Sequence, residues 1–499
     1  MSTTTAQQSL WLHTVPDAPA HPPLSGRHEA EVAVVGGGLA GLTTALLLAR
    51  RGADVVVLEA GRVGAGASGN NTAKVTALQA TRYTTLEREH SSGVAAGYAA
   101  AAAAGVELVA ALAEGIDCDL HRAPAATFAH TAGETAAVRA EAEAAERAGL
   151  PVEWTEQLDV PFPTFGAVRL AGQIVLHPAK YVRGLADAFV AAGGRIFEHS
   201  RVRDVSVTAP YRAHTADGTL TARQVVIATH YPILDRGLFF ARLEAQRSYC
   251  VAARLSSGAP PEDLAISAGS PAWSLSRHGD HLIVGGQSHP AGERGVDFDR
   301  YQALADFAHR HFDVAEITHR WSAQDPQPYD RLPMAGTYLP GAANLWVATG
   351  FDKWGLAMGT VAGELLADRI TGVPHPHAGL FSPHRVSLSG TPALLQQNFE
   401  VAKDLIGDRL VPPDAADPDD IPVDTARVLP DGLGKKGVYR DRDGVTHAVS
   451  LRCTHLGCLL RFNGAERSWD CSCHGSRFDV DGTVLEGPAT RPLPRRDPG

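Results

Sequence analysis

A glycine-rich turn near the start of the chain is the feature that most limits its fold. Gly36, Gly38 and Gly41 form the pattern Gly-x-Gly-x-x-Gly. An apolar run directly before the turn predicts a buried strand, the segment 39–50 predicts a helix, and a second apolar run at 54–58 predicts another strand. These elements form a strand–helix–strand unit, so the chain is expected to begin with a parallel sheet of the α/β class.

The spacing of the glycines is typical of a dinucleotide site. Gly36 permits a tight turn, Gly38 lets a pyrophosphate approach the backbone, and Gly41 allows the helix to pack closely on the strand. Glu59 follows the second strand, where a carboxylate can accept hydrogen bonds from ribose hydroxyls. The sequence holds one such pattern, and enzymes that pass electrons from a nicotinamide to a flavin usually need two. We therefore expect one bound nucleotide and a small-molecule electron donor.

Cysteines and histidines gather near the other end of the chain. Cys453 and His455 form a Cys-x-His pair, and Cys471 and His474 form a Cys-x-x-His pair. Two thiolates and two imidazoles suit either an iron–sulfur cluster or a structural zinc ion. Zinc would leave the other two cysteines of this segment without a role, and its usual first spacing has two to four residues between cysteines. Each loop has one of these extra cysteines, which could join the loops covalently, so a Rieske [2Fe–2S] cluster is favoured.

The rest of the chain predicts more than one unit. Its 499 residues are about three domains' worth. An Ala-rich segment at 94–113 predicts a helix. Strands at 247–255, 272–277 and 281–285, the last two joined by a turn at Gly279 and Asp280, predict an antiparallel sheet covered on one face. The segment 412–424 is rich in Asp and Pro and predicts a linker. Short strands and glycine-rich turns follow it, which are typical of a small all-β domain.

The glycine region resembles the D-amino-acid oxidase superfamily, which includes glycine and sarcosine oxidases. The resemblance rests on VAVVGGGLAGLTTALLLARRGADVVVLEA, GRVGAGASGNNTAK, QVVIATHYP, DRLPMAG and NLWVATGFDKWGLAMGTVAGELLA, and covers about residues 8 to 385. It implies FAD in a discontinuous nucleotide domain with an antiparallel sheet as the roof over the flavin. Sarcosine-oxidase-like members place a lysine for the substrate carboxylate at the position of Ala357, so an α-amino-acid substrate is in doubt.

Site residues carried over from this resemblance fall into three sets. The ADP half is assigned to Gly36, Gly38, Gly41 and Glu59, with Val202 beside the adenine. The pyrophosphate and flavin are assigned to Ser68, Asn71, Thr72 and Lys74. The isoalloxazine is assigned to Gly350, Lys353, Trp354 and Gly355. Lys353 and Trp354 are the candidate catalytic residues, because a lysine beside a flavin can stabilise developing negative charge.

The cysteine-rich segment resembles the Rieske domain of respiratory cytochrome complexes over about residues 420 to 495. The resemblance makes Cys453 and Cys471 ligands of the inner iron, and His455 and His474 ligands of the outer iron. It implies a disulfide between the two remaining members of the segment, Cys458 and Cys473. It also assigns two neighbours of the cluster: Ser476 as a hydrogen-bond donor to a bridging sulfide, and Phe478 in place of a tyrosine of high-potential members.

These assignments divide the chain into five parts. The parts are an N-terminal arm at 1–29, a discontinuous FAD-binding domain at 30–90, 171–235 and 330–385, a substrate or roof domain at 91–170 and 236–329, a helix and Asp/Pro-rich linker at 386–424, and a Rieske domain at 425–499.

Composition excludes several other classes of protein. The net charge of -10 argues against a nucleic-acid partner, which would require a basic face. No stretch has about 18 uninterrupted apolar residues, and the first residues lack the basic start and apolar run of a secretory signal, so we expect no transmembrane segment and a cytoplasmic location.

The sequence therefore predicts an FAD-dependent oxidoreductase. It is expected to oxidise a small organic donor, an amine or amino-acid-like compound, and to pass electrons singly to the cluster and then to a one-electron partner protein. Arg247 and Tyr249, on a predicted roof strand, are weaker candidates for substrate contact. Two alternatives stay open: electron flow from cluster to flavin in a reductive enzyme, and a simple flavin oxidase whose Rieske unit serves for docking or redox sensing.

Overall fold

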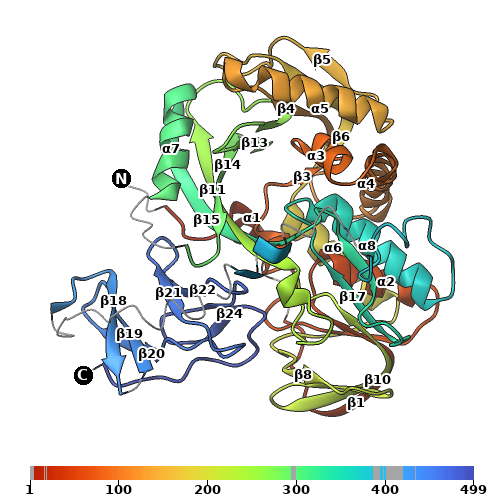
Figure 1. Cartoon of the computed structure of the whole chain (residues 1–499), viewed down its shortest axis with the longest axis vertical. Helices are drawn as coiled ribbons and strands as arrows, with labels where there is room; N and C mark the ends of the chain where they lie inside the picture. Colours follow the sequence, from red (N-terminus) through yellow and green to blue (C-terminus); the bar gives the residue numbers. More distant parts are fainter. Residues whose placement is uncertain are drawn as a thin grey trace.

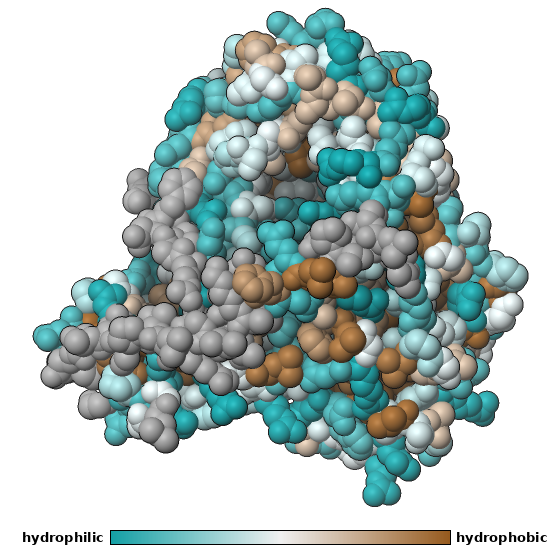
Figure 2. Space-filling view, viewed as in Figure 1, coloured by the Kyte–Doolittle hydropathy of each residue, from teal (hydrophilic) through white to brown (hydrophobic). Residues whose placement is uncertain are grey.

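The computed structural model describes residues 5–15, 17, 20–293, 299–385, 394–396, 398–399, 420–432 and 434–498. Most of the predicted helix and linker at 386–424 therefore lies outside the described residues. Figure 1 shows two large sheets, with the small C-terminal domain (blue) beside their junction. On the face of the molecule seen in Figure 2, most of the coloured surface is hydrophilic and hydrophobic side chains gather near its middle.

The first sheet is the nucleotide half of the molecule. Its central strands run parallel, as predicted, because β1 pairs with β2 and β10, and β10 pairs with β17. The strands in spatial order are β16 (Met334–Thr337), β17 (Leu345–Thr349), β10 (Gly218–Ile227), β1 (Gly26–Val35), β2 (Val55–Leu58) and β7 (Arg195–Phe197), with β9 (Tyr211–His214) and β8 (Asp204–Val205) attached to β10. The residues of β2 and β17 are all buried, as expected for parallel strands covered on both faces.

Helices cover this sheet. The predicted helix 39–50 is α2 (Leu39–Arg50), which packs beside α8 (Gly355–Ile370) and α6 (Pro178–Ala191). Elsewhere in the described part of the chain, helices lie at α1 (Leu10–Thr14), α3 (Arg82–Glu89), α4 (Ser92–Leu112), α5 (Thr135–Arg147) and α7 (Arg300–His311), and short 3₁₀ turns lie at Ala67–Gly69, Ala132–Glu134 and Phe239–Ala241; α7 packs on the second sheet.

The Ala-rich helix α4 packs against α8. A Cβ atom on Gly105 would lie 2.8 Å from the carbonyl oxygen of Ala357, so the glycine permits the close approach of the two helices. Among the described helices, α4 alone has the length and apolar composition to cross a membrane. A core helix passes the same test, and residues such as Tyr98, Val106 and Val109 are buried inside the protein.

The second sheet forms the roof. Its strands in spatial order are β15 (Val314–Pro328), β11 (Leu243–Leu255), β14 (His281–Pro290), β13 (Trp273–His278), β12 (Leu264–Ser267), β4 (His121–Phe128), β6 (Ala167–Val175) and β3 (Lys74–Val75), with β5 (Glu153–Thr155) beside β6. The pairs are antiparallel, as predicted, except that β4 and β12 run parallel. The predicted turn at Gly279 and Asp280 joins β13 to β14.

The C-terminal domain is all-β, as predicted. One antiparallel sheet contains β18 (Thr425–Asp431), β19 (Gly434–Arg440) and β20 (Thr446–Ser450). The other contains β21 (Leu460–Asn463), β22 (Ser468–Cys471), β23 (Arg477–Phe478) and β24 (Val484–Glu486). In Figure 1 the second of these sheets faces the larger domains, and the first points away from them.

Candidate functional site

The glycine turn has the close contacts that its spacing predicts. Gly36 has a φ of +113°, and a Cβ atom there would lie 2.3 Å from the carbonyl oxygen of Ala228. A Cβ atom on Gly41 would lie 2.1 Å from the carbonyl oxygen of Gly36. Gly38 is the N-cap of α2 and offers no side-chain cap; the N–H of Leu39 donates to Oγ of Ser68 at 3.0 Å, and the helix N-terminus forms part of the cavity wall. Such a terminus favours a phosphate group.

Glu59 lies next to this turn and is held there by hydrogen bonds. Its carboxylate accepts hydrogen bonds from the backbone N–H groups of Gly37 at 2.7 Å and Gly61 at 2.8 Å. Burial raises the pKa of Glu59, although these two hydrogen bonds oppose the shift. A carboxylate has about four acceptor positions, so two remain for ribose hydroxyls.

One large cavity begins at the glycine turn and reaches the roof. Its volume is about 1080 Å³. Most of the predicted site residues contribute to its wall: Gly36, Gly38, Glu59, Ser68, Asn71, Thr72, Lys74, Val202, Arg247, Tyr249, Lys353, Trp354 and Gly355. Gly41 and Gly350 are not in this wall; Gly41 packs behind the turn, and a Cβ atom on Gly350 would lie 2.6 Å from the ring of Pro328. The helix N-terminus, the acid and the length of the cavity fit a dinucleotide such as FAD.

Lys74 is a buried cation in the cavity wall. Its Nζ donates to the carbonyl oxygen of Ala265 at 3.0 Å and to the hydroxyl of Ser274. Burial lowers its pKa to about 7. The lysine is therefore poised between its charged and neutral forms at neutral pH, where an anionic cofactor would favour the charged form.

Lys353 lies on a strained turn before α8. Asp352 and Lys353 have φ values of +47° and +73°, which are unusual for residues with side chains. An ion pair of 2.7 Å between Asp352 and Arg82 holds the turn, as does a hydrogen bond of 2.9 Å from Gln327. The Nζ of Lys353 donates to the hydroxyl of Ser288 across the cavity. Strain of this kind clusters at functional sites, which supports the predicted importance of Lys353.

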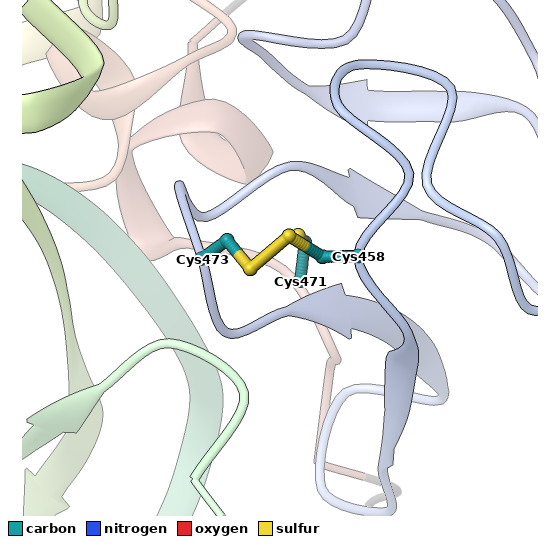
Figure 3. A group of neighbouring side chains, drawn as sticks. All are labelled: Cys458, Cys471 and Cys473. Atoms are coloured by element: carbon teal, nitrogen blue, oxygen red, sulfur yellow. A yellow bond between two sulfur atoms is a disulfide. The ribbon is translucent and has the colours of Figure 1, made fainter. Parts of the chain in front are cut away.

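The predicted disulfide between Cys458 and Cys473 is confirmed. The sulfur–sulfur distance is 2.05 Å, and the bond joins the two cysteine loops (Figure 3). The sulfur of Cys471 lies within 4.8 Å of both disulfide sulfurs. This trio does not form a metal site, because two of its sulfurs are bonded to each other and only Cys471 keeps a thiol.

The four predicted iron ligands lie at this pair of loops. The thiols of Cys453 and Cys471 share a hydrogen bond, which lowers the pKa of Cys453. The rings of His455 and His474 are 5.0 Å apart. Both Nδ1 atoms are buried and have no hydrogen-bond partner among the described residues. Burial lowers the pKa of His474 to about 3, so its imidazole is neutral, the form that binds metal. Two facing sulfurs and two unpaired nitrogens fit a [2Fe–2S] cluster held by two cysteines and two histidines.

Ser476 is buried beside the ligand sulfurs. Its Oγ accepts a hydrogen bond from the backbone N–H of Ala489 at 3.0 Å, and its hydroxyl also hydrogen-bonds to Cys453. The hydroxyl therefore faces the ligand set, and its donation to a bridging sulfide stays a prediction. Phe478 is fully buried.

Arg247 and Tyr249 face partners that the sequence did not reveal. The guanidinium of Arg247 is 1% exposed and pairs with Glu466 at 3.0 Å and Glu486 at 3.3 Å, both from the Rieske domain. The hydroxyl of Tyr249 lies 3.1 Å from Nε2 of His289 and accepts from Nδ2 of Asn463 at 3.3 Å. Contact with a substrate stays a prediction for both residues, but each has a role at the domain junction.

This junction is a buried charge cluster. Burial raises the pKa of Glu466, but the guanidinium groups of Arg247 and Arg477 hold it at about 2. Arg477 also pairs with Asp470 at 3.0 Å and Glu486 at 2.9 Å. Every charge in the cluster therefore has an opposite charge beside it, which a stable buried group requires.

The cluster loops themselves touch the larger domains. Nε2 of Gln324, on β15, donates to the carbonyl oxygen of Gly475 at 2.7 Å, and the ring of Phe240 packs against that of His474. Nε2 of His455 lies 2.6 Å from Oδ1 of Asp235. These contact residues could not be predicted from the sequence, because single Gln, Phe and Asp residues have no distinctive pattern.

The fold and the site together define a flavin-dependent redox enzyme with an iron–sulfur domain. The family "FAD dependent oxidoreductase" matches residues 31–369, and the family "Rieske [2Fe-2S] domain" matches residues 419–496. The chain therefore belongs to the FAD-dependent oxidoreductases and carries a C-terminal Rieske domain. Its cofactors are FAD and a [2Fe–2S] cluster.

Individual relatives support this assignment. The Rieske protein YhfW of Bacillus subtilis is 33% identical over 503 residues, which cover 99% of this chain and 98% of the relative. Gamma-glutamylputrescine oxidoreductase of Escherichia coli is 26% identical over 68% of this chain and 84% of its own length. The crystal structure of glycine oxidase from Geobacillus kaustophilus has a TM-score of 0.62 and 24% identity, and covers 72% of this chain and 99% of that structure. The last comparison shows the shared fold.

Proposed function

We propose that this enzyme oxidises a small organic amine in the cavity, and that the electrons leave singly through the Rieske domain to a separate carrier protein. The observation that carries the proposal is that residues of the flavin half and of the Rieske domain line one cavity. Lys353 and Trp354 of the flavin half, and Glu466, Leu485 and Glu486 of the Rieske domain, line the same cavity. Bound FAD supplies two-electron oxidation with one-electron release, and a [2Fe–2S] cluster supplies a one-electron site.

Charges in the cavity wall favour an amine. Asp325 lies in the wall, and burial raises the pKa of its carboxyl group. Such a carboxylate can accept the proton that a substrate ammonium group must lose before oxidation. His230 and Lys353 lie in the same wall and oppose this shift, and the ammonium group of Lys353 would remain for a second polar group of the substrate.

The cavity wall gives less support for a substrate with a free α-carboxylate. Ala357 stands where the resemblance places a carboxylate-binding lysine, and it is buried against α4. The guanidinium of Arg247 is neutralised by two glutamates. The amine named in the Escherichia coli relative is in line with this choice of substrate class.

The Rieske domain also lines the nucleotide end of the cavity. The guanidinium of Arg201 donates to the carbonyl oxygen of Val484 at 3.0 Å. The hydroxyl of Thr490 donates to the carbonyl oxygen of Arg203 at 3.3 Å. The segment from 484 to 490 therefore covers the nucleotide end, where it restricts the access of water to the reacting groups.

An anaerobic substrate screen tests the proposal. The holoenzyme is mixed with amines, amino acids and hydroxy acids, and flavin absorbance and the electron paramagnetic resonance (EPR) signal of the cluster are recorded together. We expect an amine to bleach the flavin and to produce the reduced-cluster signal. Bleaching by hydroxy acids alone would contradict the substrate class, and bleaching that never produces the cluster signal would contradict the transfer.

A ligand variant separates transfer from docking. His455→Ala should abolish turnover with an artificial one-electron acceptor and leave flavin bleaching by the amine intact. Turnover that is unchanged in this variant, with altered binding of a partner protein, would support a docking role for the Rieske unit instead.

A further inference from the structure

The side chain of Asp235 reaches from the flavin half to a cluster ligand. Its Oδ1 lies 2.6 Å from Nε2 of His455, and the two residues are 220 positions apart in the sequence. The side chain of His455 is 5% exposed, whereas that of Asp235 is 55% exposed. The contact is a short hydrogen bond to a carboxylate at the edge of the domain junction, and such charge-assisted bonds are the strong ones.

This hydrogen bond decides which nitrogen of His455 is free. The carboxylate accepts, so Nε2 must carry the proton. Nδ1 is then left with its lone pair, and this atom is buried without a hydrogen-bond partner among the described residues. Asp235 therefore selects the tautomer that offers Nδ1 to iron, in the way that outer carboxylates fix metal-binding histidines.

The loop that carries Asp235 is fixed on both sides of the residue. The hydroxyl of Tyr338 donates to the carbonyl oxygen of Leu234 at 2.7 Å. The guanidinium of Arg236 donates to the carbonyl oxygen of Val205 at 2.6 Å. The same loop contributes Ile233 to the cavity wall. Asp235 is thus held at a defined position between the cavity and the cluster loop.

We propose that Asp235 is a positioning residue for the cluster: it orients the His455 imidazole and lowers the reduction potential of the cluster. The sign follows from charge. Reduction adds an electron to the cluster, and a nearby carboxylate disfavours this more negative state. Only the consequence for transfer from flavin to cluster rests on the proposed function; the potential itself does not depend on the substrate.

Asp235→Asn in the full-length holoenzyme isolates the charge, because asparagine keeps an oxygen that can accept from Nε2. An EPR-monitored redox titration with mediators gives the cluster potential without any substrate. We expect reduction to become about tenfold more favourable, which is a rise of about 59 mV for a one-electron couple. Asp204→Asn is the matched control, since Asp204 is 65% exposed, contacts Arg236 at 3.6 Å and, among the described residues, forms no hydrogen bond or ion pair with His455.

Equal potentials for Asp235→Asn and the wild type, or equal shifts for Asp235→Asn and Asp204→Asn, would overturn the proposal. Asp235→Ala tests orientation, because it removes the acceptor as well. We expect broader EPR lines than in Asp235→Asn, from a less uniform imidazole orientation, and narrow lines would contradict the orienting role. A shifted potential combined with a failed amine screen would remove the proposed function and leave the role of Asp235 standing.

Discussion

At the nucleotide end of the cavity, the glycine turn and Glu59 belong to one strand–helix–strand unit, β1, α2 and β2, with Glu59 directly after it. At the cluster end, Arg247 and Glu466 are 219 residues apart and meet only because two domains dock. The first end depends on short-range geometry, and the second on the packing of whole domains. Changes at the first should therefore affect one cofactor, whereas changes at the second should affect both.

Gly41→Val should have the largest effect at the nucleotide end. Its side chain would begin 2.1 Å from the carbonyl oxygen of Gly36, so the turn must move and the helix N-terminus must leave its place. We expect the purified protein to lose FAD almost completely and to keep its iron, as measured by flavin absorbance and elemental analysis.

Gly379→Val is the control, because no atom lies within 4 Å of a Cβ atom at that position. It should retain both cofactors. If Gly41→Val lost iron and FAD in equal proportion, the nucleotide end would not be independent of the cluster end.

The sequence could predict what depends on neighbouring residues. The helix α2 begins and ends at Leu39 and Arg50 as predicted, and the glycine contacts follow from the spacing of the motif. The ligand pairs and the disulfide follow from two short motifs on two loops. The helix α7 was missed, although Tyr301, Leu304, Phe307 and Ala308 show the spacing of a helix with one buried face.

The junction could not be predicted in the same way. Asp235 and Glu466 are single acids in loops, and their partners are fixed only by how the domains dock. The same reason explains why Arg247 suggested a substrate contact. The sequence of a roof strand does not show whether a buried arginine on it pairs with a ligand or with another domain.

Arg247→Met should have the next largest effect, and it tests the cluster end. The substitution removes one of the two cations that pair with Glu466 and Glu486 and leaves only Arg477 beside them, and breaking a buried pair in this way costs about 3–5 kcal/mol. We expect a clearly lower unfolding temperature by circular dichroism, together with weaker retention of both FAD and the cluster.

Arg254→Met is the matched control. Arg254 lies on the same strand, β11, and pairs with Glu316 at the surface, where its side chain is 46% exposed. An exposed pair contributes little, so its unfolding temperature should stay close to that of the wild type. A similar fall in unfolding temperature in both variants would show that the buried ion pairs of the junction contribute no more to stability than an exposed pair.

Glu59→Ala should have a smaller effect than Arg247→Met, and it tests whether a change at the nucleotide end affects FAD alone. It removes the acceptor for Gly37 and Gly61 and the oxygens predicted for the ribose. Hydrogen bonds to a charged group contribute about 1.5–3 kcal/mol, so we expect FAD to bind about ten- to a hundredfold more weakly, as measured by equilibrium dialysis. Iron content should stay the same; a parallel loss of iron would argue against separate ends.

Ser476→Ala should have the smallest effect, because it changes one hydroxyl and no ligand. The hydroxyl is buried next to Cys453, so its donation to sulfur would stabilise the more negative reduced cluster. Its loss should lower the cluster potential by about 40 mV, since a hydrogen bond contributes about 1 kcal/mol and 59 mV corresponds to a tenfold change for one electron. Protein-film voltammetry of the full chain measures this shift, and Ser472→Ala, on the same loop, is the control.

The sign of the Ser476→Ala shift is opposite to that expected for Asp235→Asn, so the two variants distinguish a donor that faces the sulfurs from a charge that faces the imidazole. An unchanged potential in Ser476→Ala would mean that the hydroxyl hydrogen does not reach a cluster sulfur, although the oxygen accepts from the N–H of Ala489.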